Sequence, residues 1–138
     1  MLKKNLLLTL LAVFSLLAIT TSCEKTEPIH LVSDTNLKGQ NTIPVPAEGG
    51  TIHVTCTNYD SFWFPEGAVI VDGQPFKDPN STTISPVSLT PWLKTTVNKN
   101  VMTVVFEPNT TSKVRITIFE ITAGDVRTRL RFEQEAKK

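Results

Sequence analysis

The chain has 138 residues, with 14 Lys and Arg against 13 Asp and Glu, so that its formal net charge is +1. A chain of this length can form one hydrophobic core but not two. The near-zero charge provides no basic field to attract a polyanion, so we expect no nucleic-acid partner.

The first 23 residues carry the pattern of an exported protein. Lys3 and Lys4 precede an apolar run over residues 6–19, and the small residues 20–22 lead to Cys23. A positive start, a short apolar run and a small-residue cleavage site indicate a secretory signal peptide. The apolar run is shorter than the roughly 20 residues that a membrane-spanning helix needs.

Cys23 at the cleavage point resembles a bacterial lipobox, in which the cysteine is lipidated, although Thr20 stands where that pattern favours leucine. The alternative is an ordinary signal peptide before an incidental cysteine. A lipobox implies at least two acyl chains, which suffice for stable anchoring. We therefore predict a signal peptide at 1–22, a lipidated tether at 23–28 and a domain at 29–138, anchored in the outer membrane at the periplasmic face or the cell surface.

Cleavage would leave Cys56 as a lone thiol. Ile52, Val54 and Cys56 alternate with polar residues over 51–57, which is the period of a half-buried strand. This places the Cys56 thiol on the buried side. Loss of residues 1–22, which hold Lys3 and Lys4, lowers the formal net charge from +1 to −1.

Short strand signals follow one another along the chain, separated by Pro, Gly and Asn. Asp72-Gly73 favours a two-residue hairpin turn. Pro44 and Pro46 limit their segment to an edge or kinked strand, and residues 76–91 are expected to be mostly loop. The expected strands are 29–32, 51–57, 61–64, 68–71, 101–106, 113–122 and 126–134.

No helix-length amphipathic period follows the signal segment, so we predict an all-β, immunoglobulin-like antiparallel β-sandwich. The last two strands should form a hairpin around residues 123–125. If Thr122 lies opposite Val126, then Ile116 and Ile118 belong to the buried face.

Several short motifs follow one another along the chain: Gly49-Gly50-Thr51, Trp63, Trp92-Leu93, Asn109, Arg115 and Phe132-Glu133-Gln134. In this order they resemble the BACON domain family of Bacteroidetes envelope and secreted proteins. The resemblance covers about residues 43–136, and residues 65–91 are longer than the usual connection in that family. It implies an immunoglobulin-like sandwich and a role in binding carbohydrate or mucin, or as a spacer.

The sequence contains no nucleophile elbow, zinc-protease motif or phosphate-binding glycine loop. His30 and His53 are far apart and lack metal-ligand spacing. His53 lies on the polar side of its strand, where exposure is expected. We therefore predict no enzyme activity, no metal and no cofactor.

Aromatic residues are candidates for ligand contact, because an exposed indole can stack on the C–H face of a sugar. Trp63 lies between Phe62 and Phe64, and we expect it in the core. Trp92 follows Pro91 at a loop end, which leaves both core and ligand contact open. Tyr59 and Phe76 lie in expected loops and are the stronger candidates for exposed aromatic residues.

Arg127, Arg129 and Arg131 alternate along the last strand. Such residues project from one face about 7 Å apart, forming a basic ladder that could bind anionic glycan, sulfated mucin or lipopolysaccharide. One alternative is a solvated face that discourages edge-to-edge aggregation. The other is ion pairing with Glu120, Glu133 and Glu135.

Two functions follow from the sequence. The first is a non-catalytic, membrane-anchored lipoprotein whose BACON-like domain binds carbohydrate or mucin. The second is a structural spacer or an accessory subunit that binds other envelope proteins in an outer-membrane complex.

Overall fold

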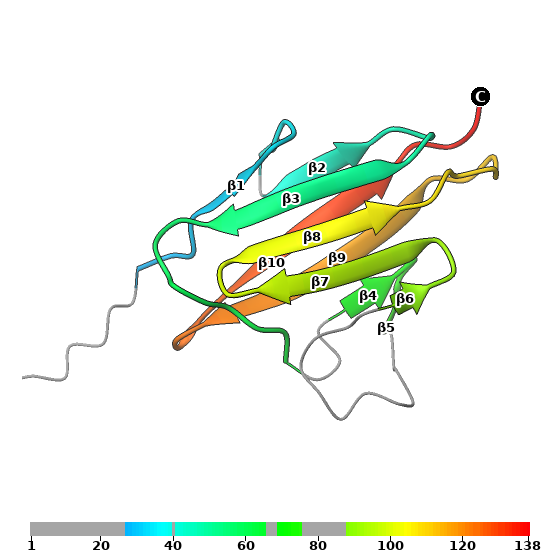
Figure 1. The fold of residues 1–138 in the computed structure, drawn as a ribbon. Helices are drawn as coiled ribbons and strands as arrows, with labels where there is room; N and C mark the ends of the chain where they lie inside the picture. The colour runs from blue at the N-terminus through cyan, green and yellow to red at the C-terminus, as the bar shows by residue number, and fades with distance from the viewer. Residues whose placement is uncertain (1–26, 40, 66–68, 76–87) are drawn as a thin grey trace, which may run out of the picture.

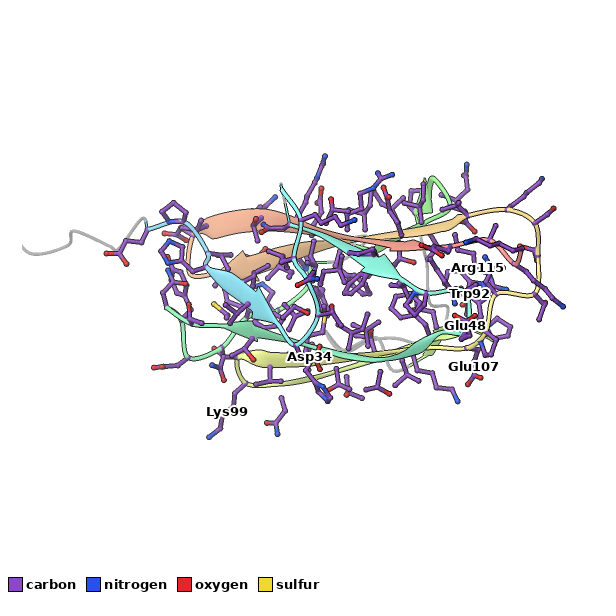
Figure 2. All side chains as sticks on the ribbon, turned by 90° about the horizontal axis from the view of Figure 1, so that it is seen from above. Asp34, Glu48, Trp92, Lys99, Glu107 and Arg115 are labelled. Carbon is purple, nitrogen blue, oxygen red and sulfur yellow. The ribbon has the colours of Figure 1, made fainter. Side chains whose placement is uncertain are left out.

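The computed structural model describes residues 27–39, 41–65, 69–75 and 88–138; Cys23 and Phe76 lie outside them. Two five-stranded sheets pack face to face, and the described residues contain no helix (Figures 1 and 2). The predicted all-β sandwich is thus confirmed. In order across the first sheet lie β1 (Leu31–Ser33), β3 (Gly50–Cys56), β8 (Val101–Phe106), β7 (Leu93–Asn98) and β6 (Ser88–Thr90). In order across the second lie β2 (Thr42–Val45), β10 (Val126–Gln134), β9 (Arg115–Ala123), β4 (Val69–Val71) and β5 (Gln74–Pro75).

The strand order is that of an immunoglobulin-like sandwich. The run β1-β3-β8-β7 corresponds to strands A, B, E and D, and β10-β9-β4 corresponds to G, F and C. The prediction of an antiparallel fold holds for every strand pair except one. β2 pairs with β10 in parallel, with Ile43 opposite Phe132 and Pro44 opposite Glu133. Proline lacks an N–H donor, which suits it to this short outermost strand.

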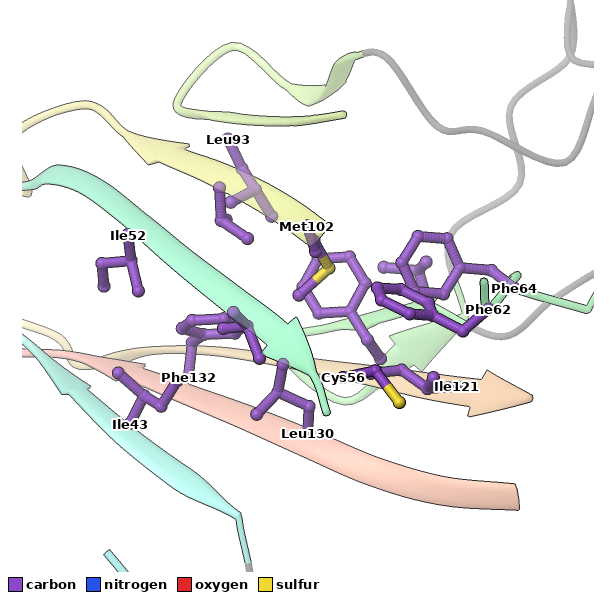
Figure 3. Packing of buried hydrophobic residues seen from close by; sticks show 14 of the residues in the cluster. Ile43, Ile52, Cys56, Phe62, Phe64, Leu93, Met102, Ile121, Leu130 and Phe132 are labelled. Carbon is purple, nitrogen blue, oxygen red and sulfur yellow. The ribbon is translucent and has the colours of Figure 1, made fainter. Parts of the chain in front are cut away.

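The core lies between the sheets and consists mainly of side chains from alternate strand positions, with Ile29, Phe62 and Phe64 added from segments outside the strands (Figure 3). Phe119 and Phe132 are fully buried, and their rings meet edge to face with centroids 5.7 Å apart. Cys56 is buried as predicted, and it is the free cysteine among the described residues. The core of the described domain therefore depends on apolar packing rather than on a disulfide.

The hairpin of β9 and β10 differs from its predicted register by one residue. Val126 lies opposite Ala123, not Thr122, because the turn uses only Gly124 and Asp125. Gly124 has φ +55°, which a two-residue turn with glycine first requires. A one-residue slip moves each side chain to the other face, so Ile116 and Ile118 lie on the outer face, and their predicted burial is wrong.

Three other expectations can be compared with the structure. The Asp72-Gly73 turn is confirmed, because it joins β4 to β5 with Val71 opposite Gln74. The strand expected at 61–64 reduces to a single bridge between Trp63 and Thr122. Part of the expected loop forms the short strand β6.

Candidate functional site

Most of the motif residues behind the family resemblance meet at one end of the sandwich. Figure 2 shows Trp92, Arg115, Glu48 and Glu107 together there, far from Lys99. The neighbouring Gly49 has φ +78°, and a Cβ on it would lie 2.2 Å from the carbonyl oxygen of Phe106. Only glycine fits this backbone approach, so the glycine of the motif has a structural cause.

Asn109 organises the loop between β8 and β9 at this end. It is 2% exposed. Its Nδ2 donates to the carbonyl oxygens of Lys113, at 2.8 Å, and Glu135, at 2.9 Å. Its Oδ1 accepts from the backbone N–H of Thr111 at 3.1 Å and from the Thr111 hydroxyl at 2.8 Å. Each polar atom of the amide is used within the fold, which leaves none for a ligand.

Both polar atoms of the Gln134 side chain are likewise hydrogen-bonded within the fold. Its Nε2 donates to the carbonyl oxygen of Glu107 at 2.9 Å, and its Oε1 accepts from Arg115 Nη1 at 3.3 Å. The bond to Glu107 joins the end of β10 to the end of β8 in the opposite sheet, and the bond with Arg115 joins β10 to β9 in its own sheet. Together with the contacts of Gly49 and Asn109, the bonds of Gln134 indicate that the motif residues at this end of the sandwich form a structural junction.

Trp92 belongs to the same junction and is half-buried. Its ring stacks against Phe106 with centroids 6.4 Å apart, and the Arg115 guanidinium carbon lies 4.6 Å from the ring centroid. The indole is therefore packed against the core and under a cation. A sugar would have to compete with these contacts.

Tyr59 lies near the opposite end of the sandwich. Its hydroxyl donates to the carbonyl oxygen of Glu27 at 2.6 Å, and its ring is partly buried against the core. A Cβ on Gly124, in the β9–β10 turn, would lie 3.8 Å from the Tyr59 ring. The candidates Tyr59 and Trp92 thus do not form one aromatic patch.

Trp63 is exposed, so its predicted place in the core is wrong. The indole is 39% exposed, whereas Phe62 and Phe64 are each 4% exposed. Consecutive side chains of an extended segment point to opposite faces, so Phe62 and Phe64 cannot both enter the core together with the residue between them. The run Phe62-Trp63-Phe64 contains this signal, and two buried phenylalanines imply an outward tryptophan.

The three arginines of β10 differ in their partners. Arg129 binds Glu120 through Nε at 2.9 Å and Nη2 at 2.6 Å. Arg131 Nε binds Glu133 at 2.6 Å. Arg127 is exposed and makes no ion pair with any residue that the structure describes. Pairing with glutamates thus accounts for two of the arginines and leaves the Arg127 charge available.

Trp63 and Arg127 lie in one row across the outer face of the second sheet. Trp63 bridges Thr122 of β9, and Thr122 lies opposite Arg127 of β10. Thr122 is only 7% exposed, and its hydroxyl has no hydrogen-bond partner among the described residues. The next row holds Glu120 and Arg129. We call these five residues the Trp63 face.

A shallow, open hollow adjoins the Trp63 face. It is lined by Asn41, Glu120, Arg127, Thr128 and Arg129. The hollow offers guanidinium groups and a carboxylate, and the exposed Trp63 indole lies in the row of Arg127 on the same sheet. Such groups can bind a polar ligand that has a flat apolar side. The hairpin register creates this juxtaposition, and sequence spacing alone did not reveal it.

His53 lies away from this surface and is exposed, as predicted. Its Nδ1 lies 2.7 Å from Asp34 Oδ2, and its backbone N–H donates to Asp34 Oδ1 at 3.0 Å. Slight desolvation raises the pKa of Asp34, but the hydrogen bonds and charge of His53 outweigh it and hold that pKa below its ordinary value. No group of three or more His, Cys, Asp or Glu in the described ranges is placed to hold a metal.

Comparisons with known proteins identify a fold relative. No model of a known protein family matches the chain, and no curated protein matches it significantly. In the described part of the chain, no helix is long and apolar enough to span a bilayer. The NMR structure of a protein from Bacteroides thetaiotaomicron is similar, with 25% sequence identity and a TM-score of 0.66 over 81% of this chain and 90% of that chain. The β-sandwich thus has a structural relative in a Bacteroidetes organism.

Proposed function

We propose that this protein is a non-catalytic lipoprotein of the bacterial outer membrane whose BACON-like domain binds carbohydrate, including mucin glycans, through the Trp63 face. The signal pattern of residues 1–22 and Cys23 supports the anchor. The order of the sequence motifs and the Bacteroides relative of similar fold support the BACON-like assignment.

The exposed Trp63 indole, in a row with Thr122 and Arg127, carries this proposal. An indole stacks on the C–H face of a sugar ring and can donate its N–H to a hydroxyl. The guanidinium of Arg127 suits a carboxylate or sulfate group, which it can bind through two parallel hydrogen bonds. The favoured ligand is therefore an acidic saccharide.

Binding of the mature protein to an array of neutral, sialylated and sulfated glycans and lipopolysaccharide saccharides tests the proposal. Trp63→Ala should weaken binding by about tenfold or more, because an aromatic side chain that the ligand covers on binding dominates the affinity of a small interface. Trp63→Phe should retain part of the affinity.

Val114→Ala is the matched control, since Val114 is 53% exposed and precedes β9 at its other end. Thermal unfolding of each variant checks that the fold is intact. A folded Trp63→Ala protein that binds as well as the unmodified protein would contradict the proposed site, and a folded unmodified protein without any hit would contradict carbohydrate binding.

A second function is favoured by the apolar part of the same outer face. Ile70 lies opposite Ile118, and Ile116 follows one row further along β9. All three are only half-buried. This small apolar surface suits an accessory subunit or spacer that contacts another envelope protein. Absence of glycan binding together with co-purification of a partner from crosslinked outer membranes would favour this function.

A further inference from the structure

The first described residues are fastened to one end of the sandwich. Asn58 Nδ2 donates to the carbonyl oxygen of Pro28 at 2.8 Å, and Asn58 Oδ1 accepts from the backbone N–H of His30 at 2.9 Å. The Tyr59 hydroxyl donates to the carbonyl oxygen of Glu27 at 2.6 Å. Ile29, between these contacts, is buried in the core. We call these contacts of Asn58 and Tyr59 the N-terminal clamp.

The clamp lies at the end that carries Trp63 and Arg127. Tyr59 approaches Gly124 in the β9–β10 turn, and the backbone N–H of Phe62 donates to the carbonyl oxygen of Lys99 in the β7–β8 turn at 3.3 Å. Figure 1 shows the described chain entering at the end with these two turns, while the C-terminus lies at the opposite end.

The connection from the clamp to Cys23 is short. Glu27 follows Cys23 by four residues, which reach at most about 14 Å when fully extended. β9 alone has nine residues and spans about 30 Å. A lipid on Cys23 would thus keep the clamp end within about 14 Å of the bilayer surface, whereas the far end, with Trp92, can lie farther from it.

We propose that the clamp holds the domain so that Trp63 and Arg127 dock against the lipid headgroups of the membrane that holds the anchor. An indole favours the interface between water and lipid, and lysine and arginine are attracted to anionic headgroups. This inference rests on the proposed lipid anchor, and docking against headgroups and binding of a glycan compete for the Trp63 indole.

Electrostatic attraction to the headgroups does not account for the docking by itself. Asp60 and Asp125 lie at the same end and offset the charges of Lys99 and Arg127. The exposed indole of Trp63 is therefore the main contact, and the clamp keeps the end of the domain that carries it near the bilayer.

Fluorescence quenching in vesicles tests the orientation, because the chain has only two tryptophans. The lipidated protein is reconstituted in phosphatidylethanolamine and phosphatidylglycerol vesicles with a nitroxide on the headgroup. Trp92→Phe leaves Trp63 as the reporter, and Trp63→Phe leaves Trp92. Trp63 should be quenched at least about twice as strongly as Trp92. The difference between the unmodified protein and Trp63→Phe gives the Trp63 signal even if Trp92→Phe impairs folding.

Loss of the clamp should remove the orientation without removing the anchor. Asn58→Ala combined with Tyr59→Phe deletes the three side-chain hydrogen bonds of the clamp, so Trp63 quenching should fall towards that of Trp92 while the protein still sediments with the vesicles. Asp34→Asn is the control, since Asp34 bonds to His53 and not to the clamp.

The outcomes separate the two proposals. Protein that fails to sediment with vesicles would contradict the anchor, and this inference with it. Sedimented protein with equal quenching of Trp63 and Trp92 would overturn the docking alone. Glycan binding by the unlipidated domain is measured independently of both results.

Discussion

Gly49 occupies a position where the backbone itself excludes a side chain. Its φ is +78°, and the space for a Cβ is taken by the carbonyl oxygen of Phe106. The backbone N–H of Gly49 donates to the carbonyl oxygen of Pro46 at 3.0 Å, closing the turn before β3. A residue that could be mistaken for part of a ligand motif is therefore explained by one steric contact.

Gly49→Ala should lower the free energy of unfolding by at least about 2 kcal/mol, because positive φ and the close oxygen both oppose a Cβ. Gly39→Ala is the matched control, since a Cβ there meets nothing within 4 Å and no positive φ is involved. Chemical denaturation of both variants measures the effect. Equal stability of the two would contradict the steric account.

At the scale of elements, the turns determine which side chains reach which face. The two-residue turn at Gly124 aligns Arg127 with Thr122 and brings Trp63 into the same row. A three-residue turn would place the isoleucines of β9 inside and exclude Phe119 from the core. The Trp63 face thus depends on one residue of turn length.

The turn between β4 and β5 provides a prediction at this scale. Asp72 has φ +48°, and its Oδ1 accepts from the backbone N–H of Ile116 at 2.8 Å. Asp72→Ala should lower the free energy of unfolding by about 1–2 kcal/mol, because alanine loses the acceptor and tolerates positive φ poorly. Asp72→Asn, which retains both properties, should cost less than half as much in the same denaturation experiment.

At the scale of the whole molecule, the two ends of the sandwich have different roles. One end joins the sheets through Asn109 and Gln134. The other end receives the N-terminal segment and carries Trp63 and Arg127. The separation follows from the strand order, because β9 and β10 run the length of the molecule between the ends.

Asn109→Ala should lower the free energy of unfolding by about 2–3 kcal/mol, because it removes a buried amide and all of its hydrogen bonds in the junction. Thr110→Ala, at the exposed neighbour, should change stability by less than about 0.5 kcal/mol. Thermal and denaturant unfolding compare the two. A glycan affinity that stays unchanged in a folded Asn109→Ala protein would agree with a purely structural role.

Alternation and turn residues were enough to predict the sandwich, the burial of Cys56 and the Asp72-Gly73 turn, because period and positive φ are local properties of the chain. The register of β9 against β10 was not predictable, because it depends on whether the turn uses two residues or three. The placement of Trp63 was missed for a related reason: alternation in Phe62-Trp63-Phe64 separates the tryptophan from the two phenylalanines, but only contact with the opposite sheet decides which of the two sets is buried.

From residue patterns alone, a β-sandwich held by apolar packing was predictable, together with a leader pattern that predicts a membrane anchor. The three-dimensional arrangement was needed to show that Asn109 and Gln134 join the two sheets, and that Trp63 lies outside beside Thr122 and Arg127. The period of a strand depends on neighbouring residues and can therefore be recognised in the sequence. The partners of a side chain across strands and sheets depend on pairing between segments that are far apart in the chain.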